Sequence, residues 1–171
     1  MLGADAAADL DNDGRVDLVE RTGTRLRLRV GDADWTVLES LSGPSGEHSS
    51  MTVVDKDHDG DLDLFWCTEN GCAIAVNDGA GSLTPDASAE GLVAGPLAPP
   101  IQVAFSDLDN DRDVDLVVAD ANAVRWLSNQ RDGTFRSIGA ERGLGTAAGG
   151  GPLQIVDLDK NGTMDLLLGG S

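Results

Sequence analysis

Residues 9–17 read DLDNDGRVD, and the same pattern returns at 55–63 (DKDHDGDLD), 107–115 (DLDNDRDVD) and 157–165 (DLDKNGTMD). Each copy places oxygen-bearing side chains at positions 1, 3, 5 and 9, and three of the four copies have glycine at position 6. Carboxylates this dense repel one another unless a cation lies among them, and hard oxygen ligands at this spacing suit Ca²⁺. Because the pattern occurs four times in register, an accidental acidic turn does not explain it.

The loops begin at residues 9, 55, 107 and 157, so they are 46, 52 and 50 residues apart. A period of about 40–50 residues is typical of a propeller or another repeat array with one supersecondary unit per repeat. The similarity extends beyond the loops, because Asn77 aligns with Asn129 and Leu83 with Phe135 at the same offset of 52. We therefore divide the single segment 1–171 into repeats of approximately 4–46, 50–96, 101–148 and 152–171.

Each complete repeat is predicted to contain four short strands. Apolar or small residues precede each loop at 6–8, 51–54, 101–105 and 153–156, and an apolar run follows from position 8 at 16–19, 62–66, 114–118 and 164–168. A third run lies at 26–30, 72–76 and 124–127, and a fourth at 35–38, 82–84 and 134–136. Short β-rich runs bounded by turns favour strands over helices, and only 86–92 and 137–143 have room for a single helical turn.

Four antiparallel strands per repeat, with most strands apolar on both faces, describe the blades of an all-β propeller. About three and a half blades are present, whereas closed propellers usually need at least 4. The segment is therefore expected to be part of a larger propeller, or to complete itself by pairing with another copy. Uncovered blade faces at its ends would favour such self-association.

The pattern D-x-D-x-[DN]-G-x-x-D-[LM], repeated before an apolar strand, resembles the FG-GAP/VCBS repeats of integrin-α-like propellers. The stretch 129–135 (NQRDGTF), followed by 140–144 (AERGL), also looks like a signature found beside ASPIC/UnbV-type sequences, and 77–83 is a looser copy. The resemblance covers essentially the whole chain. It is specific for the repeat class but for no single biological role, since the family spans adhesion receptors, secreted matrix proteins and bacterial surface proteins.

The resemblance also implies a ligand scheme, in which the side chains at positions 1, 3, 5 and 9 and the backbone carbonyl at position 7 bind Ca²⁺. The first two sites would be Asp9, Asp11, Asp13, Arg15 and Asp17, and Asp55, Asp57, Asp59, Asp61 and Asp63. The other two would be Asp107, Asp109, Asp111, Asp113 and Asp115, and Asp157, Asp159, Asn161, Thr163 and Asp165. Up to four Ca²⁺ ions are implied. The first two sites are expected to bind best, because Arg112 replaces the turn glycine of the third loop and Asn161 removes a charge from the fourth.

An EF-hand is a poorer match to these loops. It requires a bidentate acidic residue at position 12 and flanking helices. Three of the four loops have Trp66, Val118 or Leu168 at that position, and strands flank them all.

Charge and composition restrict the partners. The formal charge is −18, and the four loops hold 17 of the 30 acidic residues. So acidic a chain is not expected to bind nucleic acid or anionic lipid through its net field. No run of about 18 apolar residues is present, so no membrane span is expected. The stretch 1–4 (MLGA) lacks the features of a signal peptide, so a signal peptide is not expected within this segment.

The two cysteines flank the four residues 68–71 (TENG), a loop that suits a hairpin and would bring the thiols opposite each other. Cys67 and Cys72 therefore form either a disulfide, which would fit an oxidising compartment, or a pair of half-buried thiols.

No feature of the sequence assigns catalysis, and we expect a protein that is not an enzyme. His48 lies in a Gly/Ser-rich loop and His58 at position 4 of the second metal loop, without a partner pattern for general-base work. No G-x-S-x-G elbow, phosphate loop or C-x-x-C pair is present.

Two further groups of side chains have a structural and a functional interpretation. Trp66 and Trp126 are interpreted as core rather than ligand platforms, and Trp35 as packing between neighbouring blades. The alternation Arg25-Arg27-Arg29 puts three positive charges on one strand face, either a solvated face or a patch for an anionic ligand.

These observations predict a calcium-stabilised propeller segment of a secreted, periplasmic or cell-surface protein, which serves as an interaction or adhesion scaffold for a protein or glycan ligand. The alternatives are a non-catalytic propeller domain appended to an enzyme outside this chain, and a purely structural spacer.

Overall fold

The computed structural model describes residues 4–47, 49–87, 92–93, 95–144 and 150–169. Within these ranges the chain is all β, with no helix and therefore none able to span a membrane. The first sheet contains β1 (Ala6–Ala8), β2 (Asp17–Thr22), β3 (Arg25–Arg29) and β4 (Thr36–Ser42). The second contains β5 (Ser49–Val54), β6 (Asp63–Thr68), β7 (Gly71–Asn77) and β8 (Leu83–Asp86). The third contains β9 (Gln102–Ser106), β10 (Asp115–Ala119), β11 (Val124–Asn129) and β12 (Phe135–Ser137), and the fourth contains β13 (Leu153–Val156) and β14 (Asp165–Leu168).

Every sheet is an antiparallel meander in which consecutive strands are neighbours. This confirms the predicted propeller blades, three complete and one of two strands. Of the stretch 137–143, where a helical turn had room, residues 139–143 form a turn, in which Arg142 N–H donates to the carbonyl of Ile138 at 3.1 Å. Most of the other expected turn, 88–91 within 86–92, lies outside the described residues.

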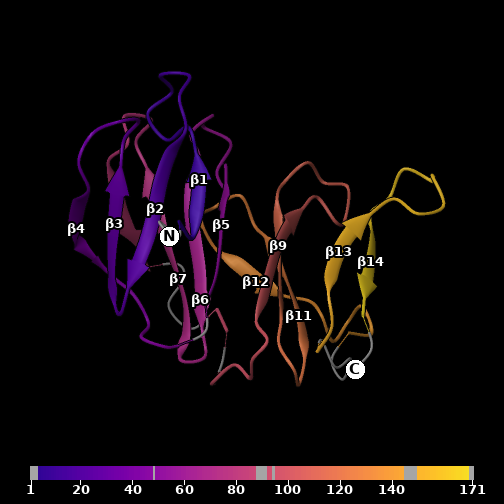
Figure 1. Ribbon diagram of the computed structural model, residues 1–171. Helices are drawn as coiled ribbons and strands as arrows, with labels where there is room; N and C mark the ends of the chain where they lie inside the picture. Colours follow the sequence, from indigo (N-terminus) through magenta and orange to yellow (C-terminus); the bar gives the residue numbers. More distant parts are fainter. Residues whose placement is uncertain (1–3, 48, 88–91, 94, 145–149, 170–171) are drawn as a thin grey trace.

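The sheets follow one another in chain order, like adjacent blades (Figure 1). Contacts between their first strands run from β1 to β5, from β5 to β9 and from β9 to β13. The first and fourth sheets lie at opposite ends of the row, so the row is an open arc (Figure 1). Each aspartate-rich loop joins the first two strands of a sheet, so the four loops recur at equivalent places along this arc.

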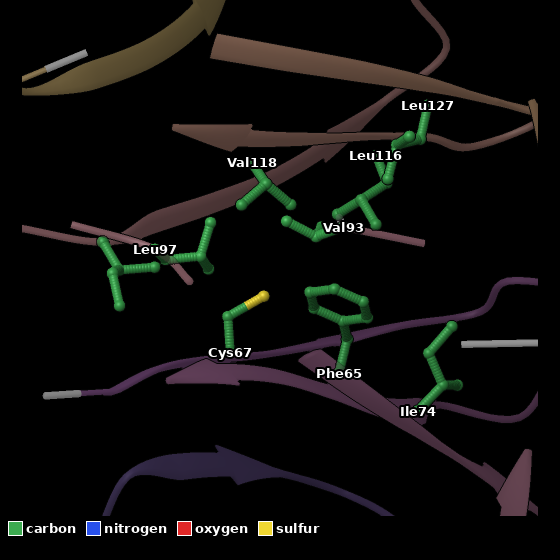
Figure 2. Packing of buried hydrophobic residues seen from close by; sticks show 9 residues of the cluster. Phe65, Cys67, Ile74, Val93, Leu97, Leu116, Val118 and Leu127 are labelled. Carbon is green, nitrogen blue, oxygen red and sulfur yellow. The ribbon is translucent and has the colours of Figure 1, made fainter. Parts of the chain in front are cut away.

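Three apolar cores lie between successive sheets, because the central strands are apolar on both faces. All residues of β6 and β10 are buried. Along β6, Leu64 and Trp66 face the first sheet, whereas Phe65 and Cys67 face the third. Figure 2 shows Phe65, Cys67 and Ile74 directed toward Leu116, Val118 and Leu127 across the core between the second and third sheets. Burial on both faces stabilises each blade through its neighbours, at roughly 1.5–3 kcal/mol per large apolar side chain.

A disulfide joins Cys67 to Cys72 across the β6–β7 hairpin, where the two residues are directly opposite. Of the two alternatives left open by the sequence, the structure therefore contains the disulfide. Cys67 is fully buried in the core between the second and third sheets.

The tryptophans have different surroundings. Trp66 is 2% exposed in the first core, and Trp126 packs against the third, as the sequence predicted. Trp35 instead lies against the guanidinium groups of Arg27 and Arg29, 4.9 and 5.8 Å from its ring centre. The aligned Leu83 and Phe135 face the sheet that precedes their own, and among the described residues no sheet precedes the first.

Candidate metal-binding loops

Each loop folds around the carboxylate at its first position. Asp9 accepts hydrogen bonds from Asp13 N–H at 3.1 Å and Gly14 N–H at 2.8 Å. The equivalent bonds recur at Asp107 and Asp157. Position 7 donates its N–H to the side chain at position 5 in all four loops, at 2.7–3.0 Å. Side-chain oxygens that bond to the backbone in this way curl the loop and bring its carboxylates together.

Two residues in every loop adopt a left-handed backbone conformation. Position 6 has φ between 75° and 95° in all four loops, and Arg112 adopts it at 75° despite its side chain. A positive φ accounts for the glycine at this position in the other three loops. Position 4 is also left-handed, with φ between 59° and 63° at Asn12, His58, Asn110 and Lys160. This second left-handed residue is not among the features predicted from the sequence, although asparagine at two of the four positions is typical of left-handed backbone.

The loops bring three carboxylates together at four places, where one oxygen of each lies within 4.8 Å of the others. In the first and third loops these are positions 1, 3 and 5: Asp9, Asp11 and Asp13, and Asp107, Asp109 and Asp111. In the second and fourth loops they are positions 1, 3 and 9: Asp55, Asp57 and Asp63, and Asp157, Asp159 and Asp165. The clusters include neither Asp17, Asp115, Asp59, Asp61, Asp113, Asn161 nor Thr163, and the ligand roles of all the residues predicted from the sequence, the position 7 carbonyls included, stay predictions.

The electrostatics of these clusters favour a bound cation. Oδ1 of Asp55 and of Asp109 is buried and accepts no hydrogen bond from any described residue. Burial raises the pKa of Asp57 and Asp109 above the usual value, and neighbouring carboxylates raise it further. Burial likewise raises the pKa of Asp11. A divalent cation would remove each of these costs, because it neutralises the charge and occupies the unpaired oxygens.

The carboxylates at position 9 also tie the loops to the sheets. Asp63 accepts the N–H of Lys56 in its own loop at 3.0 Å and that of Asn77 on β7 at 2.9 Å. Asp17 and Asp115 make the corresponding bonds, and all three side chains are almost completely buried. Burial raises the pKa of Asp63 and of Asp115 to about 6. Asp17 and Asp115 are not in the carboxylate clusters of their loops.

A second set of bonds joins each blade to the one before it. Asn77 Nδ2 donates to the carbonyl of Leu10 at 2.7 Å, and Asn129 Nδ2 donates to that of Lys56 at 2.8 Å. The repeat alignment of Asn77 with Asn129 was visible in the sequence, but the partner in the preceding loop was not.

Position 4 of each of the first three loops contacts the next loop. Asn12 donates to the side chain of Asp61 at 2.8 Å, and Asn110 donates to the carbonyl of Gly162 at 3.2 Å. His58 Nε2 lies 3.3 Å from Asp113 Oδ1. The acidic side chains at position 7 of the second and third loops therefore link blades.

Glu20 forms an ion pair with Arg27 on the outer face of the first sheet. Of the two histidines, His58 lies at the junction of the second and third blades, and His48 is outside the described residues.

Comparison with known proteins gives a family and a fold. The family model for an FG-GAP-like repeat matches residues 9–66, 55–118 and 107–168. No curated protein matches the chain. A lectin of Agrocybe aegerita, whose structure concerns recognition of non-reducing terminal N-acetylglucosamine, superposes with a TM-score of 0.63 at 20% identity. The match covers 94% of this chain and 45% of the lectin chain.

A Photorhabdus luminescens Tc holotoxin pore superposes with a TM-score of 0.54 at 22% identity, over 94% of this chain and 8% of that chain. The chain thus spans less than half the length of either protein. At these identities the likeness concerns the fold alone.

Proposed function

This chain belongs to the FG-GAP-like repeat family, and from that premise we propose that its four aspartate-rich loops bind Ca²⁺ as a structural ion. In this proposal the loaded arc of blades is an interaction scaffold within a secreted, periplasmic or cell-surface protein.

The main observation in support of the calcium proposal is that each of the four loops contains a cluster of three carboxylates. The buried, unpaired oxygens of Asp55 and Asp109 fit a metal ligand, and an all-oxygen donor set suits Ca²⁺ rather than Zn²⁺ or Cu²⁺. A bound ion would supply positive charge at the point where each chain segment turns into its second strand. The surrounding residues would orient the carboxylates, because backbone N–H groups already hold positions 1, 5 and 9.

Removal of Ca²⁺ is the direct test. An ion that binds only the folded state stabilises it by RT ln(1 + [L]/Kd), about 1.4 kcal/mol per site for a Kd of ~0.1 mM at ~1 mM Ca²⁺. Four such sites give about 6 kcal/mol, which is comparable with the whole stability of many domains. We expect EGTA to lower the melting temperature markedly and added Ca²⁺ to restore it. A melting curve that is the same in EGTA and in Ca²⁺ would overturn the proposal.

A loop variant makes the test specific. Asp57→Asn removes one charge from the second cluster, and we expect the number of Ca²⁺ ions measured by calorimetry to fall by one. Asp34→Asn is the matched control, because Asp34 is exposed and lies outside the loops. An equal loss of Ca²⁺ in both variants would contradict binding at the loop and indicate a diffuse response to net charge.

Two observations support the proposed location and role. A hairpin disulfide is typical of oxidising compartments, and millimolar Ca²⁺ outside cells suits loops of moderate affinity. The lectin with the same fold recognises a sugar, which makes a glycan a candidate ligand beside a protein. We expect the Ca²⁺-loaded chain to bind members of a glycan or extracellular-protein array. Absence of binding on both arrays would favour a structural spacer, or a non-catalytic propeller attached to an enzyme.

A further inference from the structure

A cavity of about 360 Å³ lies between the second and third blades, beside their metal loops. Four basic residues line it: Lys56 and His58 from the second loop, Arg112 from the third, and Arg131 from the turn after β11. Phe135 contributes an apolar wall. The chain has only 12 lysines and arginines and a charge of −18, so three of them in one cavity is a marked local concentration.

The basic residues of this cavity can be compared with the aligned residues of the other repeats. At each of the four positions, other repeats have a residue that is not basic. Lys56 stands where the other three loops have leucine, and His58 where two of them have asparagine. Arg112 stands where the other three have glycine, and Arg131 aligns with Gly79 of the second blade. At the first junction, the equivalent residues are the buried Leu10, Asn12, Gly60 and Gly79.

Two of the basic residues in this cavity have a left-handed backbone where other copies have glycine. Arg112 and Arg131 have φ of 75° and 61°, a conformation that glycine adopts freely at the equivalent positions. His58 is also left-handed, at 63°, as is position 4 of the other three loops. Each such residue costs of order 1 kcal/mol relative to glycine, and strain of this kind is concentrated at functional sites. Since glycine serves the turn in the other copies, the loop geometry does not require arginine at these positions.

The charges in the cavity are only partly balanced. Asp113 accepts from Arg131 and lies beside His58, and the buried ammonium of Lys56 lies 2.6 Å from Asp86. Within the described part of the chain, the Arg112 guanidinium makes no ion pair or side-chain hydrogen bond. Asp57 also lines the cavity, but in the calcium-bound protein its charge would face the ion. With Lys56 paired to Asp86, and Arg131 and His58 against Asp113, the Arg112 guanidinium is the charge left for a ligand, and the apolar wall of Phe135 favours a ligand that also has an apolar part.

We propose that this cavity binds a small organic ligand through a carboxylate, with Arg112 as the principal partner and Phe135 against its non-polar part. The volume suits a molecule of the size of a monosaccharide or an amino acid. The proposal rests in one respect on the proposed calcium function, because the charge of Asp57 in the cavity is offset by the ion bound to the second loop.

Binding is tested with two pairs of probes, in which one member has a carboxylate and the other an uncharged group at the same position. Glucuronate and phenylacetate carry the carboxylate, and glucose and phenylacetamide are their uncharged counterparts. We expect saturable shifts of the NMR signals of residues 56–58 and 129–135 with the two carboxylates, and at least tenfold weaker responses with the uncharged pair. Inorganic phosphate is the third arm. If phosphate binds as tightly as both carboxylates, or if no probe gives a saturable response, the proposal is overturned.

The decisive variant is Arg112→Gly, which restores the residue of the other three loops and relieves the strained backbone. We expect it to be at least as stable as the parent chain and to bind the carboxylates at least tenfold more weakly. Arg112→Lys is expected to recover part of the affinity, whereas Arg25→Ala, a change at an exposed arginine elsewhere, is expected to leave it unchanged. Unchanged affinity in Arg112→Gly would overturn the proposal. So would binding that is lost in EGTA yet insensitive to Arg112→Gly, because the carboxylate would then be bound to Ca²⁺.

Discussion

At the scale of single residues, the aspartates at position 9 explain why a nine-residue pattern coincides with the start of a strand. Asp17, Asp63, Asp115 and Asp165 are each the first residue of the second strand of their sheet. Their carboxylates accept N–H groups from the loop, and the first three also accept one from the third strand or the turn after it. One side chain thus connects loop and sheet, and its burial makes its ionisation costly.

This burial predicts how the metal-free protein responds to pH. The pKa of Asp63 and Asp115 is about 6 in the folded chain, against about 3.9 in an unfolded one. Between about pH 4 and 6 the folded state therefore binds more protons, so the free energy of unfolding falls as pH rises through that window. In EGTA we expect a higher melting temperature at pH 5 than at pH 7.

The control is the double variant Asp63→Asn/Asp115→Asn, measured in the same buffers. Its difference in melting temperature between pH 5 and pH 7 should be clearly smaller than that of the parent chain. If the variant and the parent chain show the same difference in melting temperature, the pH dependence comes from the overall negative charge of the chain and not from these two carboxylates.

At the scale of elements, the asparagines at the ends of β7 and β11 hold each blade to the preceding one. Asn77 is 3% exposed, and its amide donates to the carbonyls of Leu10 and Leu62. Together with the contacts made by position 4 of the loops, these directional bonds fix how far one sheet slides against the next. In the first sheet, the equivalent position is Gly31, whose N–H makes the bond to Asp17 without a side chain that reaches outward.

We therefore expect Asn77→Ala to destabilise the chain by about 1–3 kcal/mol, because the buried carbonyl of Leu10 and the half-buried carbonyl of Leu62 lose their donor. Asn122→Ala is the matched control, since Asn122 is exposed in the turn between β10 and β11. Chemical denaturation in Ca²⁺ measures both. If the two variants have the same unfolding midpoint, the amide of Asn77 does not contribute to blade packing.

The strands and the carboxylate clusters could be predicted from sequence because both are local and periodic. The repeats made the strand predictions more reliable, because each short apolar run occurs three or four times at equivalent positions. The contacts between blades could not be predicted, because the partner of Asn77 or His58 lies in another repeat and only folding brings them together. Arg112 is an instructive case: the sequence presented it as a defect in a calcium loop, whereas the structure places it in a cavity.

At the scale of the whole molecule, the two ends of the arc have different surfaces. The outer face of the first sheet is polar, with Arg27 paired to Glu20 and stacked on Trp35. The outer face of the two-stranded sheet is apolar, with Leu167 45% and Val156 38% exposed. Among the described strands, β14 pairs only with β13.

These ends predict concentration-dependent self-association of the isolated chain through its two-stranded sheet. Light scattering should give an average mass above 17.7 kDa that rises with concentration. Leu167→Lys should shift this mass toward the monomer, whereas Val37→Lys, at an exposed position of the first sheet, should have little effect. A monomer at all concentrations would argue against an adhesive end.

The replacement of glycine by Arg112 has a consequence for how such a chain can change over evolutionary time. In a fold with a single loop of this kind, a destabilising substitution in that loop reduces the stability of the whole fold. Here the same turn is built four times, and the stabilising links at the other junctions limit the damage from a change at one of them. Duplication of the blade thus lets a single junction between blades acquire residues for a new ligand, while the other junctions keep the fold stable.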